Sequence, residues 1–127
     1  MSVTIREVAG RADRRAFAEL PFELYRGDAL WVPPLLRDEL ELFDPRRNPA
    51  FDSAESRQFL AYRGERPLGR IAAILSHVAN RKHRTLNMRF GWFESVNDPE
   101  VASALLGSVE AWAREHGLET ITGPHGF

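Results

Sequence analysis

Residues 58–75 read QFLAYRGERPLGRIAAIL, and this stretch decides the fold. Segment 58–63 places side chains on the two faces in turn, which is typical of a strand. Gly64-Glu65-Arg66-Pro67 has the composition of a hairpin turn. Segment 68–75 is apolar at almost every position, so we expect a strand that is buried on both faces. The stretch therefore predicts an antiparallel hairpin at the centre of a sheet.

A third strand and the clearest helix follow this hairpin. Segment 86–95 carries three aromatic residues and is predicted to be a strand. Asp98 is a good N-cap, Pro99 suits the first helical position, and Gly117 is the expected stop. The helix between them has one apolar stripe at helical spacing, formed by Val101, Leu105, Val109, Trp112 and Ala113. Residues 119–122 begin a last strand.

The region before the hairpin predicts one strand and two helices. Segment 3–8 alternates like a half-buried strand. Asp13 is expected to cap a helix that starts just after it, and Pro21 is expected to kink or restart that helix. A second helix is predicted over 34–43. The polar stretches 45–55 and 80–84 are predicted to be loops.

Composition limits the function without identifying it. The 127 residues are 43% hydrophobic and 28% charged, with a formal net charge of -1, which indicates one globular domain over residues 1–127. The near-zero charge argues against binding to nucleic acid or anionic membranes. No cysteine is present, which excludes a thiolate site. We expect a cytoplasmic location, because no signal peptide or run of about 20 apolar residues occurs.

Five short motifs lie along the chain in a fixed order. They are Trp31-Val32-Pro33-Pro34-Leu35, Arg47-Asn48-Pro49-Ala50-Phe51, Gly69-Arg70-Ile71-Ala72-Ala73, Phe90-Gly91-Trp92-Phe93-Glu94 and Gly123-Pro124-His125-Gly126-Phe127. With the order of predicted elements, these motifs resemble a bacterial branch of the GNAT-like N-acetyltransferase superfamily. The resemblance implies an α/β (α+β) fold with a mixed sheet in the order β-α-α-β-β-β-α-β. It also implies that the chain is incomplete, lacking the C-terminal helix and strand pair.

The resemblance implies acyl transfer from acetyl-CoA to the amine of a small molecule. Glu94 lies late in the strand beside the acetyl group, where some GNAT enzymes place a general base. From the residues alone, a solvent-facing glutamate at a strand end is the favoured interpretation. Tyr25, Trp31 and Trp92 are candidates for an acceptor pocket. For Tyr25 and Trp31, ordinary core packing is an equally weighted alternative.

The same resemblance places the cofactor diphosphate at the start of the helix after residue 98. Asn97, Asp98 and Val101 are therefore the candidate cofactor-binding residues. Segment 95–101 reads SVNDPEV, which has no glycine and carries two carboxylates. Because these carboxylates repel phosphate and cap a helix well, a structural cap is the favoured interpretation.

Two further groups of residues are weaker candidates. His77 and His83 lie near three basic residues, Arg81, Lys82 and Arg84, and this group suits a phosphate or, less well, a metal ion. A solvated charged loop is the favoured interpretation. His125 lies at a strand end, where fraying is favoured over function.

Two other function classes remain open. The chain is alternatively a non-catalytic module that forms a homodimer or binds a protein partner through an open sheet edge near Ile121. The arginine content suggests nucleic-acid binding, but the net charge opposes it. We therefore expect no nucleic-acid partner and no membrane partner, and we predict no metal site.

Overall fold

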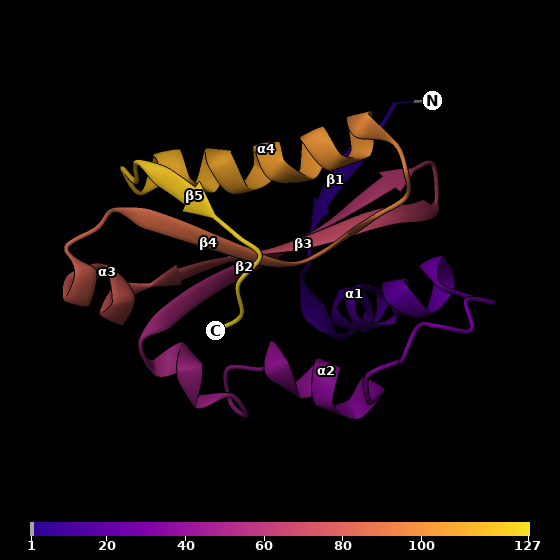
Figure 1. The fold of residues 1–127 in the computed structure, drawn as a ribbon, viewed down its shortest axis with the longest axis horizontal. Helices are drawn as coiled ribbons and strands as arrows, with labels where there is room; N and C mark the ends of the chain where they lie inside the picture. Colours follow the sequence, from indigo (N-terminus) through magenta and orange to yellow (C-terminus); the bar gives the residue numbers. More distant parts are fainter. Residues whose placement is uncertain (1) are drawn as a thin grey trace.

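A computed structural model describes residues 2–127, which form one five-stranded mixed sheet covered by helices on both faces (Figure 1). The strands are β1 (Thr4–Glu7), β2 (Ala54–Arg63), β3 (Arg66–Ser76), β4 (Asn87–Ser95) and β5 (Thr120–Thr122). The helices are α1 (Gly10–Leu24), α2 (Leu36–Leu42), α3 (His77–His83) and α4 (Pro99–Glu115), with a 3₁₀ turn, η1, at Pro49–Asp52. The predicted fold class is confirmed, with α3 and η1 as additions.

The sheet order is β1-β2-β3-β4-β5, with the strands antiparallel except for the parallel pair β4 and β5. Helix α4 covers one face, and α1 and α2 lie on the other (Figure 1). The predicted hairpin is β2–β3, and β3 sits at the centre of the sheet, as expected. Among residues 2–127, no helix combines the length and apolar character needed to cross a bilayer.

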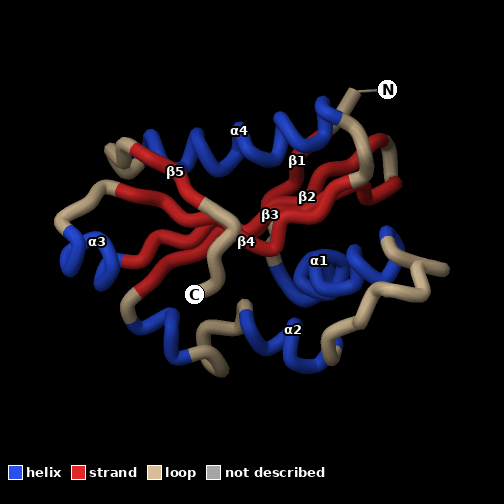
Figure 2. Tube along the Cα trace, in the orientation of Figure 1, coloured by secondary structure: helices blue, strands red, loops and turns tan. Residues whose placement is uncertain are grey.

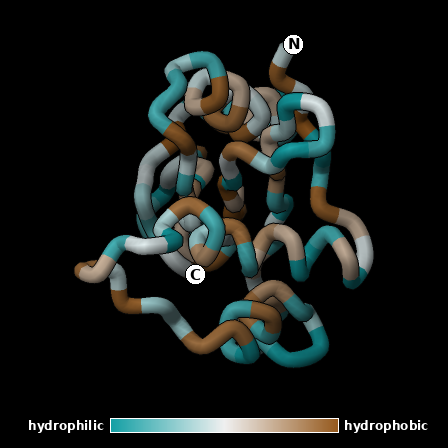
Figure 3. The backbone as a smooth tube through the Cα atoms, turned by 90° about the vertical axis from the view of Figure 1, so that its right-hand side faces the viewer, coloured by the Kyte–Doolittle hydropathy of each residue, from teal (hydrophilic) through white to brown (hydrophobic). Residues whose placement is uncertain are grey.

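Each face of the sheet carries its own hydrophobic core. The core under α4 includes Phe59, Ala61, Ile71, Ala73, Leu105, Val109 and Trp112. The core under α1 and α2 is smaller and consists of Phe17, Leu20, Phe43, Leu60 and Ala72. Brown segments also lie at the periphery in Figure 3, so hydrophobic residues are not confined to these two cores.

The helix predicted after residue 98 is confirmed as α4. Asp98 is its N-cap, and the Asp98 carboxylate accepts a hydrogen bond from the Glu100 N–H at 3.0 Å. Pro99 occupies the first position, and Gly117 follows the helix with φ of 65°. A residue with a side chain is strained at that φ, which explains why glycine ends the helix.

The expectation for the start of α1 is wrong. The helix begins at Gly10, so Asp13 lies in its first turn instead of capping it. From that position the Asp13 carboxylate accepts a hydrogen bond from the Ala9 N–H at 3.0 Å and pairs with Arg6 at 3.1 Å. A carboxylate in the first turn that reaches back to the N-cap N–H makes the returning half of a capping box, and the donor it satisfies is not the one that a cap side chain would take.

Pro21 does not restart α1, which runs through it to Leu24. The Tyr25 N–H still donates to the Pro21 carbonyl at 2.9 Å, so the next turn is intact. The missing N–H of Pro21 affects only the carbonyl four residues earlier, that of Phe17. That carbonyl has another donor, described below with the candidate site.

Three other predicted boundaries also differ from the structure. The predicted loop at 80–84 lies largely within α3, because the Ser76 hydroxyl accepts a hydrogen bond from the Ala79 N–H at 3.2 Å and caps a short helix. Segment 45–55 contains η1 and the start of β2. Helix α2 begins at Leu36, two residues later than predicted.

Candidate functional site

A β-bulge in β4 determines which side chains meet at the site. The register on either side of the bulge is Ala72 opposite Gly91 and Arg70 opposite Glu94. Trp92 and Phe93 of β4 therefore face the single residue Ile71 of β3. Trp92 has φ of 49°, a left-handed value that is uncommon for a residue with a large side chain.

The extra residue shifts the alternation of side chains along β4. In an unbroken strand, Glu94 would share a face with Phe90, which packs under α4. Because of the bulge, Glu94 instead lies opposite Arg70, and Trp92 packs in the core under α1 and α2. The bulge thus brings the predicted catalytic residue to the face that α1 covers.

Arg70 is a charged residue buried in the central strand, with 6% of its surface exposed. Its Nη1 donates to the Phe17 carbonyl at 2.9 Å, and its guanidinium lies 4.9 Å from the centre of the Phe17 ring. Helix α1 leaves this carbonyl without its usual donor, because Pro21 has no N–H. The proline in α1 therefore provides an acceptor for the buried cation.

Tyr25 and Glu94 form the central contact of the site. The Tyr25 hydroxyl donates to the Glu94 carboxylate at 2.5 Å. This hydrogen bond, together with burial and the charge of Glu94, raises the pKa of Tyr25 above its ordinary value. Tyr25 therefore stays protonated at neutral pH and fixes one oxygen of the carboxylate.

Aromatic side chains border this contact on the α1 side. The Trp31 ring stacks on the Tyr25 ring, with centroids 5.3 Å apart, and packs edge-on against Phe22 at 5.2 Å. Of the three predicted acceptor-pocket residues, Tyr25 and Trp31 are in direct contact with each other. Their role towards a substrate stays a prediction.

Trp92 lies on the same face but has different partners. Its Nε1 donates to the Glu39 carboxylate at 3.2 Å, and its ring packs edge-on against Phe43 at 4.9 Å. Glu39 and Glu94 both act on Arg70: their charges favour the guanidinium, while burial, the larger effect, lowers the pKa of Arg70. The site thus contains one buried cation and two carboxylates near enough for their charges to act on it.

Arg70, Trp92 and Glu94 border an open pocket with a volume of about 340 Å³. Its lining consists of Arg70, Gly91, Trp92, Glu94, Pro124, His125 and Gly126. The last three belong to the segment after β5, which continues beside β4 because the His125 N–H donates to the Phe90 carbonyl at 2.8 Å. Gly91 is required there, since any Cβ would collide with the His125 carbonyl.

The candidate cofactor residues lie at the start of α4, away from this pocket. The Asp98 carboxylate occupies the Glu100 N–H, and Arg63 bridges Asp98 at 3.1 Å and Glu100 at 3.4 Å. The Val101 N–H already donates to the Asp98 carbonyl, and the Val101 side chain is buried in the core. These observations confirm the structural cap and do not fit a diphosphate at this position. A cofactor role for Asn97, Asp98 and Val101 stays a prediction.

Two residues of the site, Arg70 and Glu39, were missed as candidates in the sequence analysis. Arg70 interrupts an otherwise apolar strand, and a charge in a buried strand is a signal that points to a site. Glu39 has no such signal, because it ends a run of three consecutive charged residues in α2. The weaker candidate His77 contacts Glu55 at 2.8 Å on the surface, away from the pocket.

The charge of Asp98 should contribute to the free energy of unfolding at neutral pH but not at strongly acidic pH. Its hydrogen bond from Glu100 and its ion pair with Arg63 lower the pKa of Asp98. A lowered carboxyl pKa contributes stability that is present at neutral pH and is lost as the pH falls below about 4. Asp98→Asn keeps the cap and loses the charge, so its deficit in free energy of unfolding should shrink over that range.

Asp98→Ala provides the matched comparison, because it loses both the cap and the charge. It should be less stable than Asp98→Asn at neutral pH and should remain less stable than the wild type at acidic pH. Urea unfolding at pH 7 and pH 3 measures both differences. Equal deficits for Asp98→Asn at the two values of pH would contradict the prediction.

No protein-family model matches the chain. Two curated proteins are similar in sequence. The chain is 34% identical over 114 residues to a bacterial ceramide synthase of Caulobacter vibrioides and 30% identical over 120 residues to protein YghO of Escherichia coli. The matches cover 89% and 94% of this chain but only 30% of each relative. The chain thus corresponds to about a third of the length of these proteins.

Solved structures show the fold over nearly the whole chain. A tandem GNAT protein from the clavulanic acid biosynthesis pathway superposes with a TM-score of 0.70 at 16% identity, covering 94% of this chain and 35% of that one. An N-acyl amino acid synthase from uncultured soil microbes superposes with a TM-score of 0.63 at 16% identity, covering 94% of this chain and 70% of that one. The chain therefore has the fold of the GNAT acetyltransferases.

Proposed function

We propose that the chain carries the residues of an N-acyltransferase that bind and activate the amine. Such an enzyme transfers an acyl group from a thioester to the amine of a small molecule. The observation that supports this proposal is the hydrogen bond from Tyr25 to Glu94, a carboxylate that lines the open pocket. Amine acylation needs a base near the nucleophilic nitrogen, and a carboxylate beside a pocket is suited to that role.

In the proposed reaction, the nitrogen of a neutral amine attacks the thioester carbonyl. A C–N bond forms, the C–S bond breaks, and the sulfur leaves as a thiolate that takes up a proton from water to give the thiol. Glu94 accepts the proton that the nitrogen loses, while Tyr25 holds the carboxylate in position through the hydrogen bond it donates. Trp31 and Tyr25 provide the apolar wall against which the amine is oriented.

The similar proteins support acyl transfer as the reaction class and do not identify the substrate. One relative is named a ceramide synthase and one solved neighbour an N-acyl amino acid synthase, and both names describe acylated amines. Acetyl-CoA is the predicted donor. Because the start of α4 does not fit a diphosphate, we assign no reaction step to residues there.

Replacing Glu94 should abolish most of the transfer activity. Glu94→Gln keeps the shape of the side chain and removes the base, so the rate should fall by roughly a hundredfold or more. Tyr25→Phe removes one hydrogen bond to a charged group, so the rate should fall by about tenfold. The assay measures the thiol released from a thioester in the presence of an amine.

Glu65→Gln is the matched control, because Glu65 is exposed in the turn between β2 and β3. Its rate should equal that of the wild type. A Glu94→Gln variant that is folded and fully active would overturn the assignment of the base.

Binding of acetyl-CoA tests the cofactor prediction separately. If the diphosphate binds near the start of α4, the carboxylate of Glu100 opposes it. Glu100→Gln should then tighten binding about two- to fivefold, the effect expected of one exposed charge. Calorimetry measures the affinity, and Glu115→Gln at the far end of α4 is the control. Unchanged affinity in Glu100→Gln would place the diphosphate elsewhere, and absence of binding would refute acetyl-CoA as the donor.

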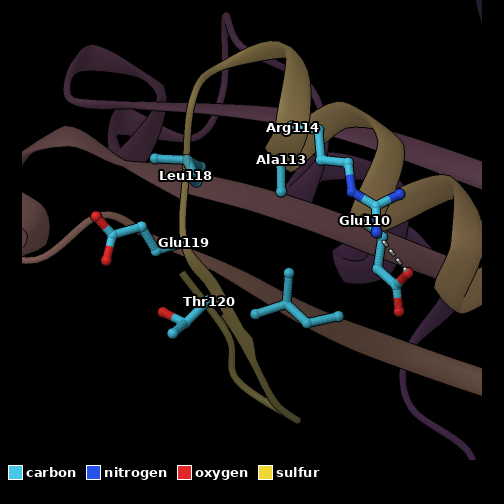
Figure 4. A pocket seen from close by; sticks show the side chains of 7 residues that line it. Glu110, Ala113, Arg114, Leu118, Glu119 and Thr120 are labelled. Atoms are coloured by element: carbon cyan, nitrogen blue, oxygen red, sulfur yellow. Dashed lines mark ion pairs between the residues drawn. The ribbon is translucent and has the colours of Figure 1, made fainter.

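A second candidate function is a non-catalytic module that dimerises through a sheet edge. Within residues 2–127, β5 is an edge strand that pairs only with β4. A pocket lined by Glu110, Ala113, Arg114 and residues 118–121 lies between this edge and α4 (Figure 4). Unpaired edges of this kind accept a strand from another chain.

This second candidate predicts a dimer at high protein concentration. Ile121 is half-buried at the edge, so Ile121→Lys should interrupt strand pairing between two copies and give a monomer. Light scattering over a concentration series measures the mass. A clean monomer of the wild type at high concentration would refute dimerisation.

A further inference from the structure

The connection between α1 and α2 is an uninterrupted apolar stretch. Residues 29–36 read ALWVPPLL, eight residues without a polar side chain. The first seven belong to no helix or strand, and we call residues 29–35 the apolar loop. This loop lies at the outside of the molecule, as the tan segment between α1 and α2 on the right of Figure 2.

The aliphatic side chains of the apolar loop are exposed to solvent. Leu30, Val32 and Leu35 are 91%, 85% and 71% exposed. Single exposed hydrophobic residues are common on protein surfaces, but a contiguous group of this kind marks a contact surface. Among residues 2–127, the remaining large exposed hydrophobic residues are Val78 and Leu86, which are 46% and 50% exposed and lie elsewhere.

We propose that the apolar loop docks the protein onto the surface of a lipid bilayer. Inserting Leu30, Val32 and Leu35 into the interface removes their apolar surface from water, which is favourable. Pro33 and Pro34 have no backbone N–H, so the loop brings fewer unpaired donors into a region that is poor in water.

The charges beside the apolar loop favour a hydrophobic contact over an electrostatic one. Arg26 is paired with Glu23 at 2.9 Å, Arg37 is paired with Glu41 at 3.6 Å, and the exposed Asp28 and Asp38 add negative charge beside the loop. The loop therefore presents hydrocarbon with no excess of positive charge. Our expectation of no membrane partner rested on net charge and on the length of apolar runs, and neither quantity measures the exposure of a short loop.

The docked loop lies next to the candidate site. Trp31 belongs to the loop and stacks on Tyr25, which donates to Glu94. An amphiphilic amine in the bilayer would thus reach the Glu94 carboxylate along the Trp31 and Tyr25 rings. This last step rests on the proposed function and names its substrate class; the docking itself does not depend on catalysis.

Co-sedimentation with phosphatidylcholine vesicles tests the docking. The wild type should sediment with these vesicles, which carry no net charge. Its partition coefficient should change little between about 0.1 and about 0.5 M salt, because added salt screens attractions between charges and leaves a hydrophobic contact in place. The partition coefficient of the triple variant Leu30→Ser/Val32→Ser/Leu35→Ser should be lower than that of the wild type by roughly tenfold or more. The matched control, Val78→Ser/Leu86→Ser, should bind like the wild type.

Several outcomes would overturn the proposal. The folded wild type could fail to sediment, the triple variant could bind as well as the wild type, or binding could be lost at high salt. A wild type that is a dimer in solution, with a monomeric triple variant, would instead show that the loop binds a second copy of the chain. Circular dichroism of each variant confirms that it is folded. Glu94→Gln should bind vesicles like the wild type, so a failure of docking and a failure of the proposed chemistry are separate results.

Discussion

The buried guanidinium of Arg70 is the interaction on which the arrangement of the site depends. Removing such a charge from water costs on the order of several kcal/mol unless nearby groups compensate it. Here the compensation comes from the Phe17 carbonyl and ring and from the charges of Glu39 and Glu94. These partners belong to α1, α2 and β4, so accommodating one cation fixes three elements around the central strand.

Helix α1 and strand β4 both depart from regular geometry to meet this requirement. Pro21 leaves the Phe17 carbonyl free for Arg70, and the bulge at Trp92 turns Glu94 towards the same face. Either departure alone looks like a local irregularity. Together they explain why Tyr25, which ends α1, lies within hydrogen-bonding distance of a carboxylate 69 residues later in the chain.

The sequence predicted features that depend on local chemistry and missed those that depend on distant contacts. The cap at Asp98, the stop at Gly117 and the central hairpin follow from neighbouring residues and are confirmed. The bulge in β4 leaves no mark in the residue pattern, because β3 sets it through the register. Glu94, Tyr25 and Trp31 were named from the resemblance, but the hydrogen bond from Tyr25 to Glu94 and the position of Glu94 opposite Arg70 required the tertiary structure.

The separation of the two cores has a consequence for which positions of the sequence can vary independently. The core under α4 contains none of Arg70, Trp92 and Glu94, whereas these three side chains lie on the face covered by α1 and α2, the helices that the apolar loop joins. Substitutions on the α1 and α2 face can therefore change the surroundings of Glu94 while the packing of α4 is preserved. Changes to the candidate pocket and changes to the larger core then fall on opposite sides of one sheet.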